Sequence, residues 1–480
     1  MTKLVRHILV LILIHISFIS TDADPLVKFK ISRPYCVFNF LETCKGVYGT
    51  SEALKEYIEA HTATDSSFKQ LINDYKSLYL ETTFFREGFP ETRPSYRSVK
   101  DFLIMAAVQS NDIPTFKKQI VGMLHNTDAQ LLISLMERAD IYYEKIIWEQ
   151  HGKAAIRQLK NLQKYQSAAN DAFLALSRFY NSSWANDMPF TVALTPVPGK
   201  KGGTAATPHA NVLCADFLTE ETNYIGRMAI VLHEICHVLY AEQSRKVQFD
   251  LESLFFKSTS PYANVAHNFF DEGLATACGN GWSYQLLAGK ADTSGWYSDP
   301  YIDGFGHALF PLVSQYLKEN KSVDSSFVIE AIRLFGEKFP KSPQDYGIQF
   351  NHLTMYSDEE RIPDRNQIKQ NIYEQFAVSW LNFSTPIRGA ESMAFLKESG
   401  GTQFIIVDRN HEEVFSALKS TLLDLANIPY NLDEKFVINY YDTSKRLIVI
   451  AKIDEGETGN LFKVLKEKQY MDTSQPYWKF

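Results

Sequence analysis

The 480-residue sequence has few cysteines, glycines and prolines for its length. Five cysteines are too few to build a fold from disulfide bonds. With 23 glycines and 18 prolines, the chain belongs to neither the collagen-like nor the low-complexity class. It also lacks a basic excess: the formal net charge is −7, which argues against nucleic acid as a partner. After residue 23 there is no apolar run long enough to span a membrane, so we expect no stable membrane insertion once the leader is removed.

The composition that remains is that of a globular protein. Hydrophobic residues make up 45% of the chain and charged residues 22%, so there is enough apolar material for a core. The length favours two or three domains. Helical periodicity dominates and is interrupted by short strand-like segments, which predicts an α+β fold with a mainly helical body.

The first 23 residues have the three parts of a secretory signal peptide. Lys3 and Arg6 precede an apolar run at 8–19, and Thr21 and Ala23 occupy the −3 and −1 positions of a small-residue cleavage site. The alternative is an uncleaved membrane anchor, but the run is shorter than the ~20 residues that a membrane-spanning helix needs. We therefore expect a secreted or periplasmic protein.

Changes in periodicity divide the remaining chain into four regions. We predict a helical N-terminal region at 24–125, a catalytic domain at 126–340, a mixed connecting region at 341–400 and a small α/β domain at 401–480. Cys36 and Cys44 flank a short segment in the first region and could pair in an oxidising compartment.

The segment MAIVLHEICHVLY, at 228–240, is the most informative in the chain. Without His233, Glu234 and His237 it is wholly apolar, which is typical of a buried helix. Two histidines at i and i+4 lie on one face, where both imidazoles can bind one zinc ion. Glu234 can reach a water at that ion as the general base of an H-E-x-x-H site. The alternative is a buried helix with two satisfied core histidines.

A catalytic zinc site needs a third protein ligand and an open position. The candidate segment is 260–281, read as one helix with an apolar stripe that includes Phe269 and Gly273. Glu272 flanks this stripe, whereas Asp271 and His267 point away from it. We therefore predict Glu272 as the third ligand.

Neighbouring positions on the same predicted helix support the site. Thr276 is placed to hydrogen-bond a ligand. The small Gly273 and Ala275 would allow close packing on the motif helix. Two strands are predicted before that helix, at 189–196 and 210–218, and the second is the natural edge strand for pairing with an extended peptide.

These motifs resemble those of the gluzincins, the zinc metallopeptidases related to thermolysin and the zinc aminopeptidases. The matching residues are His233-Glu234-Ile235-Cys236-His237 and Asn268-Phe269-Phe270-Asp271-Glu272-Gly273-Leu274-Ala275, and the resemblance covers roughly 185–320. It implies a zincin-like catalytic domain with one zinc ion per chain and a peptide or protein substrate. It also implies a Tyr or His that stabilises the oxyanion, for which Tyr301 and His307 are candidates.

The chain also departs from that family. His237 and Glu272 are 35 positions apart, which is longer than the spacing near 20 in well-known members. The G-x-M-E-N element that binds a free amine in zinc aminopeptidases is missing. Two other functions stay open: a zinc hydrolase that does not act on peptides, and an exported binding protein with a vestigial metal site.

Overall fold

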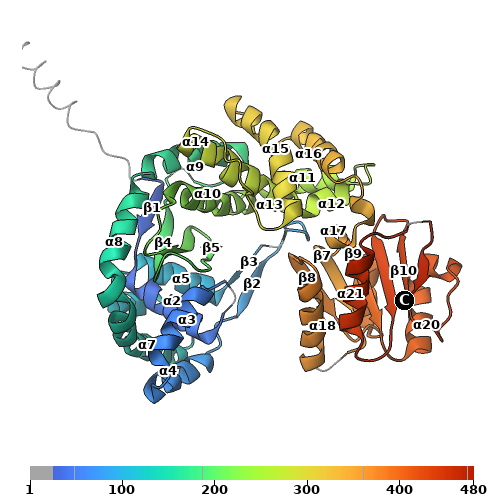
Figure 1. The fold of residues 1–480 in the computed structure, drawn as a ribbon, viewed down its shortest axis with the longest axis horizontal. Helices are drawn as coiled ribbons and strands as arrows, with labels where there is room; N and C mark the ends of the chain where they lie inside the picture. Colours follow the sequence, from blue (N-terminus) through green and yellow to red (C-terminus); the bar gives the residue numbers. More distant parts are fainter. Residues whose placement is uncertain (1–24, 48, 94, 186, 360–361, 473) are drawn as a thin grey trace, which may run out of the picture. The chain divides into compact units, whose positions relative to one another are not determined.

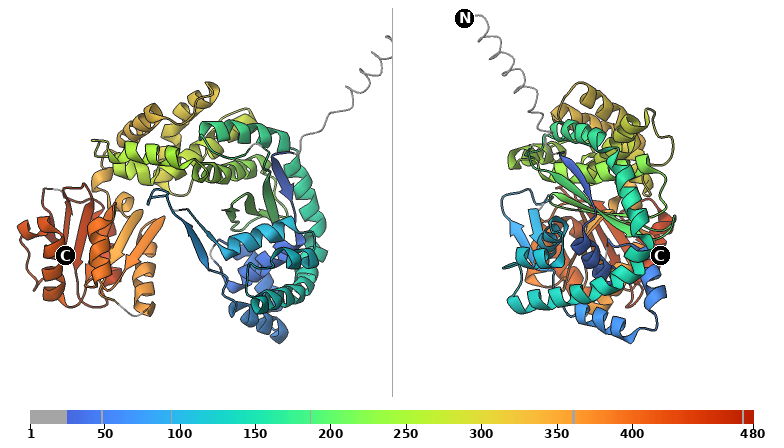
Figure 2. Two further views of the ribbon diagram at one scale, coloured as in Figure 1. Left: turned by 180° about the vertical axis from the view of Figure 1, so that it is seen from behind. Right: turned by 90° about the vertical axis from the view of Figure 1, so that its left-hand side faces the viewer.

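The computed structural model describes residues 25–47, 49–93, 95–185, 187–359, 362–472 and 474–480. The predicted signal peptide at 1–23 lies outside these residues. The fold is α+β with a mainly helical body and several small sheets, as the sequence predicts (Figures 1 and 2).

The described chain forms two compact units, each assembled from more than one segment. The first comprises the described residues up to Asp250, together with Leu274–Trp296 and Phe310–Val323. The second comprises Leu251–Gly273, Tyr297–Leu309 and Asp324–Phe480. The predicted divisions after residues 125, 340 and 400 all fall inside a unit.

The first unit is built mostly of helices around one four-stranded sheet and one hairpin. Its elements are β1 (Val27–Lys30), α2 (Arg33–Lys45), α3 (Glu52–Thr62), α4 (Ser66–Lys76), β2 (Thr83–Arg86), β3 (Ser95–Ser98), α5 (Val99–Gln109), α6 (Ile113–Gln119), α7 (Asn126–Tyr143), η1 (Glu144–Trp148), α8 (Glu149–Gln163), α9 (Gln166–Phe179), β4 (Phe190–Val197), β5 (Ala206–His209), β6 (Val212–Leu218), α10 (Tyr224–Ala241), η2 (Thr276–Ser283) and α14 (Tyr284–Ala288).

The four-stranded sheet has the order β1-β4-β6-β5, with only β5 antiparallel to its neighbour. Because strand side chains alternate between faces, Val212, Cys214 and Leu218 pack on the core formed by α2–α7. The opposite face carries Leu213 and Phe217, and α10 packs against β5 and β6.

The prediction that 210–218 supplies the edge strand is wrong. Within that segment, β6 lies between β4 and β5, so β5 forms this edge of the sheet. The physical reason is the turn at Ala210, which has a left-handed backbone and lets 206–209 fold back on β6 as an additional strand.

Cys36 and Cys44 do not form the disulfide bond that the sequence suggested, because both are free thiols on the same helix, α2. Eight residues of α-helix separate their Cα atoms by about 12 Å. A disulfide requires Cα atoms less than about 7 Å apart, so these two cysteines cannot be bridged while α2 is intact.

The second unit contains a six-stranded sheet in the order β12-β10-β11-β9-β7-β8. The four strands from β11 to β8 run parallel, and β10 is antiparallel to both of its neighbours. Its own elements are α12 (Ala263–Asn268), α16 (Ser325–Lys338), η3 (Ser342–Gln344), α17 (Tyr346–Gln349), β7 (His352–Tyr356), α18 (Ile362–Gln375), β8 (Trp380–Ser384), α19 (Ala390–Glu398), β9 (Thr402–Val407), α20 (His411–Thr421), η4 (Leu423–Asn427), β10 (Phe436–Tyr441), β11 (Leu447–Lys452), α21 (Thr458–Lys468) and β12 (Tyr477–Lys479).

Both faces of this sheet are covered by helices, which produces two separate cores. Phe404 and Val449 belong to the core that includes α18 and α21. Ile405 and Ile450, one position further along each strand, belong to the core that includes α20. The sheet joins strands from the predicted regions 341–400 and 401–480 into one layer.

Three helices contribute residues to both units, and one of them carries a predicted ligand. They are α11 (Arg245–Phe256), α13 (Phe270–Ala275) and α15 (Pro300–Lys318).

In the part of the chain that the structure describes, no helix combines the length and apolar character needed to cross a membrane.

Candidate metal centre

The motif helix α10 forms where the sequence predicts it. Asn223 begins the helix as its N-cap, and its side-chain oxygen accepts a hydrogen bond of 3.0 Å from the backbone nitrogen of Gly226. Most α10 side chains are buried, and His233 is only 6% exposed. Glu234 and His237 are half-buried, so one stripe of an otherwise buried helix reaches solvent.

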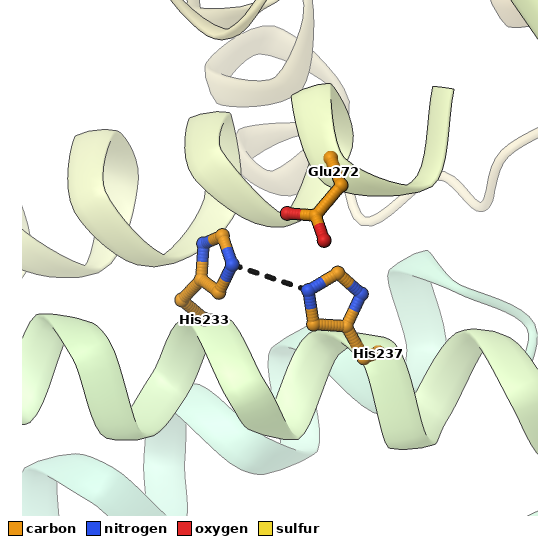
Figure 3. Close-up of side chains that lie close together, drawn as sticks. All are labelled: His233, His237 and Glu272. Atoms are coloured by element: carbon orange, nitrogen blue, oxygen red, sulfur yellow. Dashed lines mark hydrogen bonds between the residues drawn. The ribbon is translucent and has the colours of Figure 1, made fainter. Parts of the chain in front are cut away.

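The two histidines of α10 face each other through the same ring atom. Nε2 of His233 and Nε2 of His237 are 3.1 Å apart (Figure 3). Two nitrogens that bind one tetrahedral zinc ion at 2.0–2.1 Å would be about 3.4 Å apart. The imidazoles are therefore close to the arrangement that a shared metal ion requires.

Glu272 on α13 completes the cluster. One ligand atom from each of His233, His237 and Glu272 lies within 4.8 Å of the other two. Figure 3 shows the carboxylate of Glu272 pointing toward both rings. The first unit resumes at Leu274, only two residues after Glu272 on the same helix. The structure thus brings together the three residues that the sequence predicts as metal ligands.

Asn280 orients His233 and was missed by sequence reasoning. Its Oδ1 atom lies 3.0 Å from Nδ1 of His233, and its Nδ2 atom donates a 3.3 Å hydrogen bond to the carbonyl oxygen of Trp296. Because Nδ2 donates to Trp296, Oδ1 is the acceptor for Nδ1–H of His233. This tautomer leaves the lone pair on Nε2, which faces His237.

The residues that pack closely on α10 and hydrogen-bond the predicted ligands differ from those that the sequence predicts. A Cβ added at Gly273 would meet Phe305 rather than α10, whereas one added at Gly279 would meet the backbone of His233. Thr276 is fully buried, and its hydroxyl has no hydrogen-bond partner among the described residues. The reason is that 260–281 is not the single helix that the sequence predicts: α12 ends at Asn268, α13 spans Phe270–Ala275, and η2 is a π-helix, so one α-helical projection does not describe the whole segment.

Two thiols pack between α10 and η2. Burial raises the pKa of Cys236 well above its usual value, and the neighbouring thiol of Cys278 raises it further. Both are free cysteines with no exposed surface. Both thiols therefore act as small apolar side chains that fill the contact between the two helices.

Tyr301 and His307, the candidates for oxyanion stabilisation, both lie on α15. The Tyr301 hydroxyl donates a 3.1 Å hydrogen bond to Asp345, and burial followed by the Asp345 charge raises its pKa. Nε2 of His307 lies 3.7 Å from Asp303, one turn earlier on the helix. Neither residue belongs to the described ligand cluster.

His352, at the start of β7, is a further titratable group near Glu272, the predicted third ligand. Burial lowers the pKa of His352 to about 4, and the His267 charge lowers it as well. The charges of Glu272 and Asp271 act in the opposite direction, so His352 is within electrostatic reach of both carboxylates. Its Nδ1 atom lies 2.8 Å from Oδ1 of Asn351. Nothing in the sequence indicates that His352 lies near Glu272.

His267, which the sequence placed away from the site, contacts Glu252 on α11 through Nε2.

The chain was also compared with known proteins. No protein-family model, no curated protein and no solved structure matches it.

Proposed function

We propose that this protein is a zinc-dependent metallopeptidase of the gluzincin type. The observation that carries the proposal is the convergence of His233, His237 and Glu272 within 4.8 Å, from two helices that are far apart in the sequence. Two neutral imidazoles and one carboxylate are a common ligand set of catalytic zinc. A structural zinc site would be expected to have a fourth protein ligand, and the described cluster contains three.

In this function His233, His237 and Glu272 would hold the ion, and Asn280 would keep His233 in the tautomer that presents its Nε2 lone pair to it. When bound, zinc would supply a Lewis acid that makes a water molecule nucleophilic near neutral pH. Glu234 follows His233 on α10 and lies about 60° around the helix from His237. Its carboxylate takes the proton of the attacking water and passes it to the leaving amine.

The edge strand β5 gives an extended peptide a place to bind. It ends the four-stranded sheet next to β6 and packs against α10, the helix that carries Glu234. A peptide that adds to this edge would form backbone hydrogen bonds alongside the motif helix. This arrangement favours a peptide over a small ester as the substrate.

The decisive experiment measures zinc content and peptide hydrolysis on the same preparations. We expect one zinc ion per chain by elemental analysis and cleavage of a mixture of peptides by mass spectrometry. Glu234→Gln should keep the zinc and lose about 10²–10⁴-fold in turnover, because it removes the base but no ligand. Wild-type turnover in Glu234→Gln would refute the mechanism.

Glu272→Ala separates the third ligand from the base. This variant should lose zinc as well as activity, and full zinc occupancy in it would remove Glu272 from the site. Cleavage of esters without cleavage of peptides would instead favour a zinc hydrolase of another class. We also propose that the protein is exported, and N-terminal sequencing of the mature chain tests the predicted cleavage after residue 23.

A further inference from the structure

A pocket opens beside the metal cluster, next to the N-terminal half of α10. It has a volume of about 350 Å³, and the residues that line it all belong to the first unit. We call it the α10 pocket. The lining residues that matter for its chemistry are Glu221, Arg227, Ile230, Asn280, Asp292 and Trp296.

The α10 pocket and the proposed general base lie along one stripe of α10. At 100° per residue, Arg227, Ile230 and Glu234 fall within about 60° of one another on the helix surface. Ile230 is 36% exposed, which is unusual on this buried helix. Ile230 is about 6 Å and Arg227 about 10 Å from Glu234 along the helix axis.

Asn280 connects the pocket to the metal cluster. It lines the pocket and also accepts the hydrogen bond from Nδ1 of His233. Because an extended peptide advances about 3.3 Å per residue, a substrate cleaved next to Glu234 would place a side chain in the pocket within about three residues of the cleaved bond.

The charges that line the pocket leave an acidic excess. Arg227 donates a 2.6 Å hydrogen bond to Glu221 and a 2.7 Å hydrogen bond to the Thr204 hydroxyl, so its charge is already balanced within the protein. Asp292 accepts hydrogen bonds of 3.0 and 2.9 Å from the backbone nitrogen and the hydroxyl of Ser294. Among the described lining residues, no second basic side chain balances Asp292.

Two aromatic side chains line the same pocket, those of Trp296 and Tyr284. Aromatic faces attract cations, and Trp is the strongest of them. The Trp296 indole packs edge-on against Phe310, with ring centroids 5.4 Å apart, which holds it in position. A carboxylate together with aromatic rings can recognise an ammonium or guanidinium ion.

We propose that the α10 pocket binds a basic side chain, that of Lys or Arg, close to the bond that is cleaved. The proposal rests on the proposed peptidase function and names its substrate class: peptides with a basic residue within about three positions of the cleaved bond. Asp292 supplies the charge that selects this residue. It does not take part in the chemistry.

The test compares cleavage profiles of the zinc-loaded full chain on one mixture of peptides. Wild-type protein should cut sites enriched in Lys and Arg within three residues of the bond. Asp292→Asn removes the charge at nearly constant volume and should lower that enrichment about tenfold, and Asp292→Lys should abolish it. Glu467→Lys, on an exposed position of α21, is the matched control and should keep the wild-type profile.

Two results would overturn the proposal. One is an unchanged Lys and Arg enrichment in both Asp292 variants, and the other is a wild-type enrichment in Asp and Glu, which would assign selection to Arg227. A calorimetric titration of zinc-loaded Glu234→Gln protein with blocked trilysine and blocked trimethionine needs no turnover. We expect trilysine to bind at least tenfold more tightly, and Asp292→Asn in the same background should remove the difference.

The hydrolysis assay tests the peptidase function and the tripeptide titration tests the basic-side-chain site, so either proposal can be refuted without the other. Asp292-dependent trilysine binding without any hydrolysis would refute the peptidase function and keep the basic-side-chain site. Hydrolysis with equal binding of both tripeptides would keep the peptidase function and refute the site.

Discussion

Gly279 lies directly against His233. A Cβ atom added at Gly279 would stand 2.5 Å from both the Cα and the backbone nitrogen of His233, closer than real Cβ contacts allow. The obstacle is helix backbone, which cannot move aside as the end of a flexible side chain can. Close contact between η2 and α10 therefore depends on glycine at this position, and Asn280 is the next residue along η2.

We predict that Gly279→Ala separates η2 from α10. Overpacking of this kind costs about 1–3 kcal/mol of the free energy of unfolding, and the shift would also pull Asn280 from His233 and weaken zinc binding. Denaturant unfolding and a chelator competition assay measure the two effects. Gly203→Ala is the control, since nothing lies within 4 Å of a Cβ there. Equal stability and zinc affinity in the two variants would contradict the prediction.

Asn280→Ala should lower zinc affinity about 10–100-fold, because Nδ1 of His233 loses its acceptor and the ring loses its orientation. Asn280→Asp keeps an acceptor oxygen and should recover most of the affinity. Competition against a chelator at fixed pH measures both variants. If Ala and Asp bind zinc equally well, the hydrogen bond does not position His233.

Arg93 should hold the C-terminal end of α10 in place. Its guanidinium donates to the carbonyl oxygen of Tyr240 and to Oε1 of Gln243, and it lies 3.6 Å from the centre of the Tyr240 ring. The carbonyls at the end of a helix have no partners within the helix, and a cation there also interacts favourably with the helix dipole. We expect Arg93→Ala to lower the free energy of unfolding by about 1–3 kcal/mol.

Denaturant titration measures the Arg93 effect, with Arg86→Ala as the control because Arg86 is exposed on β2. A similar loss in both variants would mean that the contact with α10 is unimportant.

The N-terminal region also supplies strand β1, which pairs with β4. Arg93 and β1 both attach this region to the unit that carries α10, so we expect its proteolytic removal to unfold that unit rather than to activate the protein.

Asp216 on β6 predicts a pH dependence of stability. Burial raises the pKa of its carboxyl group to about 7, and the Ala205 backbone nitrogen and Arg227 only partly oppose this. An unfolded Asp has a pKa near 3.9, so between about pH 4 and pH 7 the folded chain holds a proton that the unfolded chain has released. This residue therefore lowers the free energy of unfolding as the pH rises through that window.

Asp216→Asn keeps an oxygen for the Ala205 hydrogen bond and removes the titration. We expect the loss of stability between pH 5 and pH 8 to be smaller in the variant than in the wild type, with the variant the more stable at pH 8. Urea unfolding at the two pH values measures this. An identical pH dependence in both proteins would show that Asp216 does not titrate in the folded state.

The members of the His/His/Glu cluster could be predicted because the spacing that brings them together is a local property of the sequence. The i, i+4 spacing of His233 and His237 places both rings on one face of any helix that forms there. The apolar stripe of the following segment predicted Glu272 over Asp271 and His267 from helical projection alone. These predictions use only the geometry of one helix at a time.

The supporting residues could not be predicted in the same way. Asn280 and Gly279 act from a π-helix, whose angular spacing departs from the α-helical projection. The edge strand β5 depends on a turn that folds four residues back onto β6. His352 comes near Glu272 only because β7, 80 positions later in the chain, begins there.

By itself, the sequence determined the α+β class, the motif helix and the three residues that cluster as predicted metal ligands, because helical periodicity and residue spacing are local properties. Only the tertiary structure decided which groups surround those ligands: the Asn280 hydrogen bond, the Gly279 contact, the β5 edge and the α10 pocket. Each of these depends on packing between segments far apart in the chain. Hydrophobic burial drives that packing, and because it is non-directional, the sequence does not show which segments will meet.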